Sequence, residues 1–137
     1  MAIDAVDDAV MATLQGDATL AALAPGQVHR DLAPEGVAET GVYVVVEVQP
    51  ERIVYEQGGI AHTISGYRVT AYDRSPVKTQ AQAAADRVDA LLTAALTIPG
   101  QTHMATIRIG RESASVDDGG VIWRHQVAEY EVWSDPS

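Results

Sequence analysis

The sequence predicts an α+β fold: an antiparallel sheet of two hairpins, with about four main strands, and one long helix and an N-terminal helix packed on one face. Two observations predict the strands: segments rich in β-forming residues flank glycine turns within residues 42–73 and again within residues 103–133. A third observation predicts the helices: apolar residues recur at helical spacing at the start of the chain and between the two hairpins.

The N-terminal segment, residues 2–15, predicts an amphipathic helix whose acidic residues lie toward its N-terminal end, where they suit the helix dipole. Its apolar residues recur every three or four positions: Ile3, Val6, Val10 and Leu14. Gly16 ends this helix. Asp17 then has the position of an N-cap for a short second helix that runs through Leu23.

The first predicted hairpin follows a short strand near residues 27–31 and an irregular loop. Its β-branched and aromatic residues predict strands over 42–55 and 61–73, with a turn at 56–59. Pro50 cannot donate a ladder hydrogen bond, so it marks an edge, a bulge or a break in the first of these strands.

The long helix is expected to begin at Ser75-Pro76, an N-cap followed by proline at the first helical position, and to end before Pro99-Gly100. One stripe collects its apolar residues: Val77, Ala81, Ala84, Ala85, Val88, Leu91, Leu92 and Ala95. Because many of these side chains are alanine, the helix can approach a sheet closely.

The second predicted hairpin has strands at 103–117 and 121–133 around the turn Asp118-Gly119-Gly120, and a polar tail follows at 134–137. No segment inside residues 27–133 is a linker long enough to divide domains. Residues 1–137 are therefore expected to form a single domain, a length that can bury a core without disulfides or metals.

The composition is that of a soluble globular protein, with 47% hydrophobic and 20% charged residues among 137. The chain has no cysteine, which excludes disulfides, a thiolate nucleophile and a cysteine-ligated zinc ion. The net charge of −10 disfavours binding to nucleic acid, although an acidic surface can keep DNA from adhering. Neither the N-terminus nor the uncharged segment 90–107 predicts a signal peptide or a membrane helix.

The stretch HRDLAPEG, residues 29–36, resembles the catalytic loop of protein kinases, H-R-D-L-x-P-E-N. Asp31 would be the catalytic base, but Gly36 stands where the metal-binding asparagine is required. Too few residues precede His29 for a nucleotide-binding lobe, and a chain without phenylalanine has no D-F-G motif. We interpret the stretch as the end of a strand that leads into a loop.

No other pattern predicts a catalytic, metal or cofactor site, so the protein is expected not to be an enzyme. The four histidines lack the spacing of three to five residues that metal ligands have on helices and hairpins. Glu129 and Glu131 share one face of the last strand, where paired carboxylates can perform acid–base chemistry. A solvated face or a subunit contact explains this spacing better.

Trp123 and Trp133 lie ten residues apart on the last strand, hence on one face if no bulge intervenes. Burial in the core would explain them, and so would a contact with another subunit, because aromatic residues concentrate at interfaces. For Trp133, near the end of the chain, both alternatives stay open.

Several segments together carry a family resemblance. The N-terminal ones are GDATLAALAPG, residues 16–26, and VHRDLAPEGVAETGVYVVVEV, residues 28–48, with its A-P-x-G loop and Tyr-Val-Val strand. The central ones are YRVTAYD and SPVKTQAQAAADRVDALL, and the last is RESASVDDGGVIWRHQVAEYEVW, which ends in Y-E-V-W. In this order they resemble the tail completion proteins of long-tailed bacteriophages, which include tail terminator and tail-to-head joining proteins. Gly41-Val42 departs from the proline that the family usually has before the Tyr-Val strand.

The resemblance covers residues 2–133 and implies a structural role in the virion. Such proteins form a hexameric ring that caps the tail tube, ends its polymerisation and joins the tail to the head connector, with DNA passing through the lumen. For this chain it implies a homohexamer with two protein partners, the major tail tube protein and the head–tail connector or neck protein. It implies no cofactor, no specific DNA binding and no membrane. The expected location is the tail or neck of the virion, after assembly in the host bacterial cytoplasm.

Two alternatives stay open. One is a head-completion or neck ring protein, such as a stopper or adaptor. The other, ranked last, is a small α+β ligand-binding domain or enzyme, which would need a deep pocket with convergent polar groups.

A ring protomer presents two different faces to its neighbours, and sheet edges and long hairpins suit that role. We therefore expect the hairpin at 49–62 or the hairpin at 112–122 to reach outside the protomer. The candidate contact residues lie near these hairpin tips or the chain end: Tyr55, Gln57, Gly58, Gly59, Asp117, Asp118 and Trp133.

Overall fold

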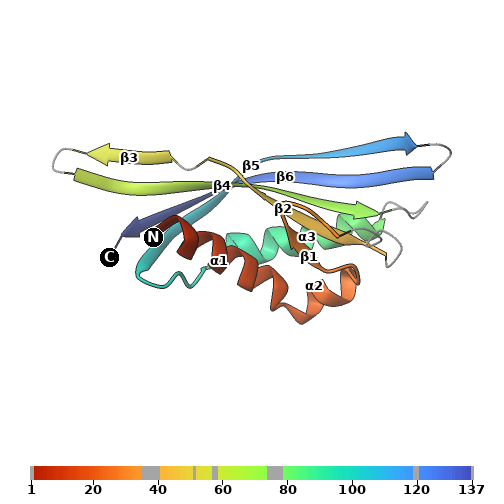
Figure 1. The fold of residues 1–137 in the computed structure, drawn as a ribbon, viewed down its shortest axis with the longest axis horizontal. Coiled ribbons are helices and arrows are strands. Elements are labelled where there is room, and N and C mark those ends of the chain that lie inside the picture. The colour runs from red at the N-terminus through yellow and green to blue at the C-terminus, as the bar shows by residue number, and fades with distance from the viewer. Residues whose placement is uncertain are drawn as a thin grey trace.

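The computed structural model describes residues 2–34, 41–50, 52–56, 59–73, 79–118 and 121–136. One layer is a long sheet and the other consists of helices, as Figure 1 shows. The helices are α1 (Ala2–Gln15), α2 (Ala18–Leu23) and α3 (Thr79–Thr93). The strands are β1 (Val28–Arg30), β2 (Tyr43–Val48), β3 (Arg52–Glu56), β4 (Gly59–Asp73), β5 (Gln101–Asp118) and β6 (Val121–Pro136).

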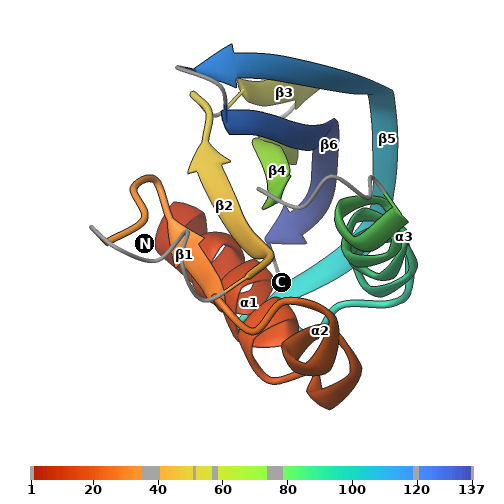
Figure 2. The same ribbon diagram turned by 90° about the vertical axis from the view of Figure 1, so that its right-hand side faces the viewer.

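The six strands are arranged in the order β1-β2-β4-β6-β5, and β3 also pairs with β4. The pairs of β4 with β2, β3 and β6 are antiparallel, and so is the pair of β5 with β6. The helices lie on one face of the sheet (Figures 1 and 2). The predicted α+β class and the position of the helices are therefore confirmed, while the description as two hairpins is correct only in part.

The first predicted hairpin is interrupted on one side. The segment predicted as one strand over 42–55 forms two strands, β2 and β3, with the break at Gln49 and Pro50. Of the three alternatives predicted for Pro50, an edge, a bulge or a break, the structure has the break, since proline cannot donate to the ladder. The N–H of Gln49 still donates to the carbonyl of Gly66 at 2.9 Å, which keeps the interruption close to β4.

The expectation of a wholly antiparallel sheet is wrong at one edge. β1 pairs with β2 in parallel, so that Val28 lies opposite Val44. The chain comes from α2 through Gln27, whose φ of 71° is left-handed, and enters β1 in the direction that β2 later takes. The N–H of Val44 also donates to the carbonyl of Gln27 at 3.0 Å. A pattern of three residues indicates a strand but not its direction, which depends on where α2 ends.

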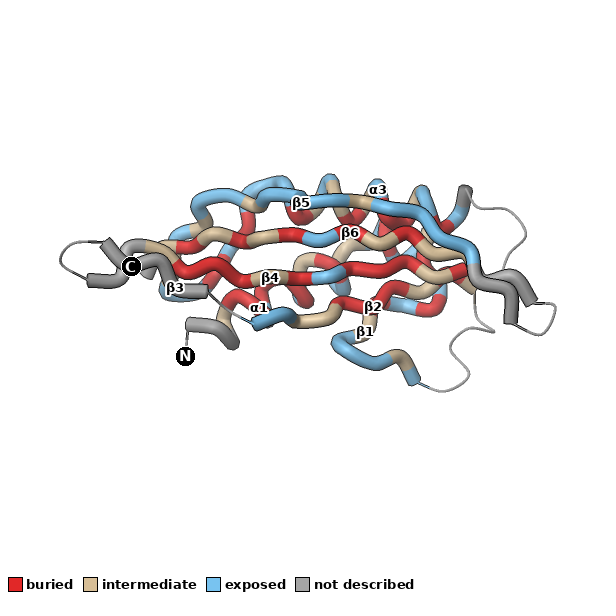
Figure 3. Tube along the Cα trace, turned by 90° about the horizontal axis from the view of Figure 1, so that it is seen from above, coloured by how far each residue is buried: buried red, intermediate tan, exposed pale blue. Residues whose placement is uncertain are grey.

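The core lies between the sheet and the helices, and buried positions alternate along β6 (Figure 3). Of the predicted stripe, α3 buries Ala81, Ala84, Ala85, Val88 and Leu92, and Leu91 is partly buried. Ala95 is exposed, contrary to the prediction, because α3 ends at Thr93 before the stripe does. The predicted N-cap at Ser75 lies outside the described residues.

The predicted polar tail at 134–137 is wrong for its first residues, because β6 continues to Pro136. Ser134 is fully buried and lies opposite Thr63 of β4 and His103 of β5. A strand flanked on both sides gains hydrogen bonds for each added residue, so polar residues can extend it. The polar composition of this segment therefore reflects its place between two strands, not the end of the fold.

Candidate functional site

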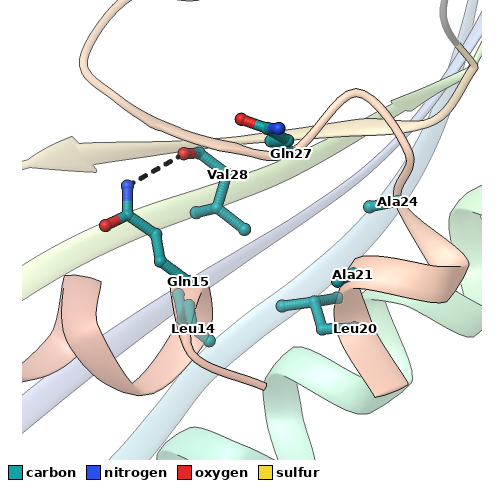
Figure 4. A pocket seen from close by; sticks show the side chains of 7 residues that line it. All are labelled: Leu14, Gln15, Leu20, Ala21, Ala24, Gln27 and Val28. Carbon is teal, nitrogen blue, oxygen red and sulfur yellow. Dashed lines mark hydrogen bonds between the residues drawn. The ribbon is translucent and has the colours of Figure 1, made fainter. Parts of the chain in front are cut away.

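A shallow hollow of about 280 Å³ lies between α1, α2 and β1 (Figure 4). Leu14, Leu20 and Val28 supply apolar walls, and the side-chain amide of Gln15 donates to the carbonyl of Val28 at 3.1 Å. None of the seven lining residues is an acid, a base or a nucleophile. The hollow can accept an apolar group, but its lining offers no groups for general acid–base or covalent chemistry.

The kinase-like stretch has structural contacts. Asp31 follows the edge strand β1, where its N–H donates to the carbonyl of Val46 at 2.8 Å. Its carboxylate accepts a hydrogen bond from the N–H of Val48 at 3.0 Å. A ring nitrogen of His29 contacts the carbonyl of Gly26 at 2.7 Å. The carboxylate that a kinase would use as a base is thus bound to the backbone of β2.

His103 is another histidine with structural contacts. Its Nδ1 accepts from the N–H of Leu96 at 3.1 Å, and its Nε2 is 2.8 Å from the hydroxyl of Thr106. Burial lowers the pKa of His103, which favours the neutral ring that these contacts require. Among the described residues, no group of three histidine or acidic side chains could hold a metal ion.

Two Tyr–Asp–Arg clusters join helices to the sheet. In the first, which we call the α1 cluster, the hydroxyl of Tyr67 on β4 donates to Asp7 of α1 at 2.5 Å. Arg30 of β1 lies 3.1 Å from the other carboxylate oxygen of Asp7. Burial, with the Asp7 carboxylate as the next cause, raises the pKa of Tyr67 far above its usual range. Asp7 therefore contributes to the core, beyond the favourable contact with the helix dipole that its position predicts.

The second, the α3 cluster, repeats this chemistry beside the first. Tyr130 of β6 lies directly opposite Tyr67, and its hydroxyl donates to Asp89 of α3 at 3.1 Å. Arg108 of β5 lies 3.3 Å from the same carboxylate oxygen. Burial and then the Asp89 charge raise the pKa of Tyr130 above its usual range. Each helix thus receives one central tyrosine and one arginine from an outer strand.

Asp17 joins α2 to α3. It caps α2 as predicted, accepting from the N–H of Leu20 at 2.8 Å. The guanidinium of Arg87 donates to both of its carboxylate oxygens, at 2.8 and 2.9 Å. These hydrogen bonds, first from Arg87 and then from Leu20, lower the pKa of Asp17 to about 2.

The helix-free face of the sheet is acidic at its centre. Glu47, Arg68 and Glu129 form one row across β2, β4 and β6, and Arg68 lies 3.2 Å from Glu129. Glu131 and Glu112 belong to the same face by register. Among the described side chains of this face, four glutamates therefore stand against one arginine. The interpretation of Glu129 and Glu131 as a solvated or contact face agrees with this position.

The outer strand β5 carries exposed apolar side chains. Met104, Ile107 and Ile109 are 45%, 47% and 59% exposed. The register of β5 with β6 shifts between His103 and Ala105 and again between Arg108 and Gly110. Met104 and Ile109 are the extra residues at these two bulges. The sequence does not predict these three exposed side chains, because the register that produces a bulge is not visible in one strand.

The predicted contact residues are distributed over both ends of the sheet (Figure 1). Tyr55 is in β3 and Gly59 begins β4, while Asp117 and Asp118 end β5 at the other end of the molecule. Gln57 and Gly58 lie outside the described residues. The structure thus does not bring the two predicted hairpin tips together within one chain.

Trp133 is half-buried on the helix-free face, opposite Ile64 and with its ring 6.0 Å from that of His62. Its buried indole N–H has no hydrogen-bond partner in the described part of the chain. Both alternatives for Trp133, core and subunit contact, therefore stay predictions. The side chain of Trp123 lies outside the described ones.

Comparison with known proteins decides the family. Residues 8–135 match the family model described as tail completion protein gp17. The chain belongs to this family. No curated protein sequence matches it at a significant level.

Solved structures share the fold of this tail completion protein. A chain in the virion of a native gene transfer agent particle is 21% identical, with a TM-score of 0.74 and 97% of each chain covered. The gp17 protein of bacteriophage SPP1 is 18% identical, with a TM-score of 0.59, covering 96% of this chain and 89% of that one. At these identities the likeness concerns the fold.

The resemblance to tail completion proteins that the sequence indicated is confirmed. This tail completion protein is a structural component of the virion tail or neck, a role that implies assembly with other tail and head proteins. The family is one of structural proteins, not one known for catalysis. None of the described helices is long and apolar enough to cross a membrane.

Proposed function

We propose that this tail completion protein forms a ring, of six copies, that caps the tail tube, ends tube polymerisation and joins the tail to the head connector. The observation that supports this most directly is the family match over residues 8–135. The long sheet supports it as well, because its two edges differ, and unlike surfaces generate a ring when the rotation between copies closes.

DNA passes through the lumen of this ring in the proposal, and the helix-free face of the sheet lines it. Four glutamates and one arginine among its described side chains give this face a net negative charge. A negative wall repels phosphates, so DNA slides past it rather than binding.

The first experiment uses electron microscopy to observe the assembly and to measure the length of tail tubes. We expect the purified protein, alone or on tail tubes, to form a closed ring in electron microscopy. Tail tube protein polymerised in its presence should give tubes of limited length, while omission should give longer ones. Unlimited tubes in the presence of the protein would contradict the terminator role.

A neck or head-completion ring is the alternative, and the position of the ring in the particle separates the two. Labelled protein seen against the tube end in electron micrographs supports a terminator. Label found only on the head side, with no contact to the tube, would assign the protein to the neck.

The lumen assignment is tested by charge reversal. We expect rings of Glu47→Lys/Glu112→Lys to bind a short DNA duplex in fluorescence anisotropy, with an affinity that falls steeply with salt. The control Asp8→Lys/Gln82→Lys/Ala90→Lys adds the same charge to exposed positions of the helix layer. If the control rings bind DNA as well as the first variant, the helix-free face does not line the lumen.

A further inference from the structure

The two edges of the sheet differ in length and in what protects them. β5 has 18 residues, about 60 Å of extended chain, and no described strand pairs with its outer edge. β1, at the opposite edge, has three residues. Figure 3 shows β5 and β1 on opposite sides of the molecule, with β5 exposed along much of its length.

The two bulges of β5 place apolar side chains at the edge of the sheet. A bulge commonly protects an edge strand by twisting it away, often with a charged residue beside it. Here the extra residues are apolar, since Met104 and Ile109 are those that have no partner in β6. Ile107 lies between them, so three exposed apolar side chains follow one another along the edge.

Contacts to α3 hold this edge in place. Arg108 and Arg111 point to the helix side, where Arg108 lies 3.3 Å from Asp89 and Arg111 is paired with Asp86. The bulge at Ile109 lies between these two arginines. The segment therefore cannot turn Ile109 toward the core without breaking two ion pairs between β5 and α3.

The β1 edge ends in an exposed leucine. Leu32 is 83% exposed and follows Asp31, whose φ of 62° is left-handed. That conformation is unfavourable for most residues other than glycine, although aspartate tolerates it better than most. Two hydrogen bonds between Asp31 and β2 hold it, one donated by its N–H and one accepted by its carboxylate, and the N–H of Leu32 donates to the carbonyl of Arg30 at 2.7 Å. The turn thus directs Leu32 to solvent.

We propose that the bulged β5 edge, with Met104, Ile107 and Ile109, binds the β1 edge of a second copy of this chain around its Leu32. The inference rests on the proposed ring and names the surfaces that build it. A second copy is the occupant because one chain carries both unlike surfaces on opposite edges of one sheet. Contact between such surfaces is head-to-tail and can close into a ring. Two β5 edges cannot pair regularly, because each bulge interrupts the ladder.

Cysteine cross-linking tests the proposal directly, because the natural chain has no cysteine. We expect the Leu32→Cys/Ile109→Cys variant of the full chain to form, under mild oxidation, a ladder of covalent oligomers on a denaturing gel. Leu32→Cys alone and Ile109→Cys alone should stay monomeric on that gel. Dimers from Ile109→Cys alone would show β5 meeting β5, and a double variant without a ladder would also overturn the proposal.

Mixing two single-edge variants provides a second test. Leu32→Asp and Met104→Asp/Ile109→Asp should each be folded, because the replaced side chains are exposed, and each should be monomeric in light scattering. Mixed, they retain one intact edge each, so we expect one-to-one dimers and no rings. A ring formed by either variant alone would overturn the edge assignment.

Controls separate this inference from the ring itself. Ala22→Asp/Ala94→Asp changes two exposed positions away from the sheet edges and should keep the wild-type mass. Circular dichroism spectra should be the same for all these variants. If the wild type forms rings and the edge variants form them as well, the edge contact is refuted while the ring itself stands. If the wild type forms no rings and the Leu32→Cys/Ile109→Cys variant does not cross-link, even on tail tubes, both the ring and the edge contact are refuted.

Discussion

The α1 cluster and the α3 cluster have the same three residue types, yet they differ in how deeply the carboxylate is buried. The side chain of Asp7 is 3% exposed, whereas that of Asp89 is 28% exposed. The two tyrosines are equally buried, and the two arginines are similarly exposed. Because water can replace a lost partner only where it reaches the carboxylate, the same chemistry should have different energetic weight in the two places.

The two clusters also join different elements of the fold. The α1 cluster attaches α1 to the centre of the sheet and to its short edge strand β1. The α3 cluster attaches α3 to β5, directly before the bulge that exposes Ile109. We infer that the first stabilises the framework, while the second positions the edge that the proposed ring uses.

The largest expected effect is that of Asp7→Ala. It leaves the hydroxyl of Tyr67 without its acceptor in the core and Arg30 without its partner. We expect the free energy of unfolding to fall by about 3 kcal/mol, because the buried hydroxyl of Tyr67 loses its partner. Asp89→Ala, the matched change in the α3 cluster, should lower the free energy of unfolding by about 1 kcal/mol, because water reaches this carboxylate. Urea unfolding at one protein concentration measures both, and equal losses would mean that burial of the carboxylate does not set its weight.

Removing the tyrosine hydroxyls should give a smaller difference in the same direction. Tyr67→Phe deprives buried Asp7 of a donor and should cost about 2 kcal/mol. Tyr130→Phe leaves Asp89 accessible to water and should cost about 1 kcal/mol. The comparison uses the same urea titration, with unchanged m-values as the sign that only the native contact is lost. A larger effect for Tyr130→Phe would reverse our ranking of the clusters.

Acid should act on a third helix contact, between Asp17 and Arg87, with the smallest effect. The pKa of Asp17 is lowered from 3.8 to about 2 in the folded chain. A carboxylate whose pKa is lower in the folded state stabilises the fold above pH 3.8, and this contribution is lost as the pH falls from 3.8 toward 2. Arg87→Met removes the main cause of the shift.

The contribution of Asp17 is measured by comparing the pH dependence of stability in the wild type and in Arg87→Met. Since both contain the same other carboxylates, stability in this pH window should fall less steeply in Arg87→Met than in the wild type. Urea midpoints measured at several pH values provide the comparison. Parallel pH profiles would show that this ion pair does not contribute to acid sensitivity.

The sequence predicts the structure correctly where local chemistry decides it. Asp17 caps α2, Pro50 interrupts a strand, and the alanine-rich stripe of α3 faces the sheet. Each of these depends on the residue and its near neighbours along the chain. The family resemblance succeeded for a related reason, because it rests on the order of such local segments.

The candidate site was less predictable, because it depends on register between strands that are distant in sequence. Met104 and Ile109 become exposed only through bulges against β6, and Asp31 adopts its left-handed turn only beside β2. The sequence-based candidates at the hairpin tips remain predictions. The parallel direction of β1 and the extension of β6 through Ser134 likewise follow from tertiary position.

The two bulges of β5 have a consequence for the unassembled chain. An uninterrupted edge of this length with apolar side chains would be a template for indefinite stacking into fibrils. The bulges leave the apolar side chains available for a specific contact but remove the regular backbone repeat that a fibril needs. The bulges should therefore protect unassembled copies of the chain from this kind of stacking.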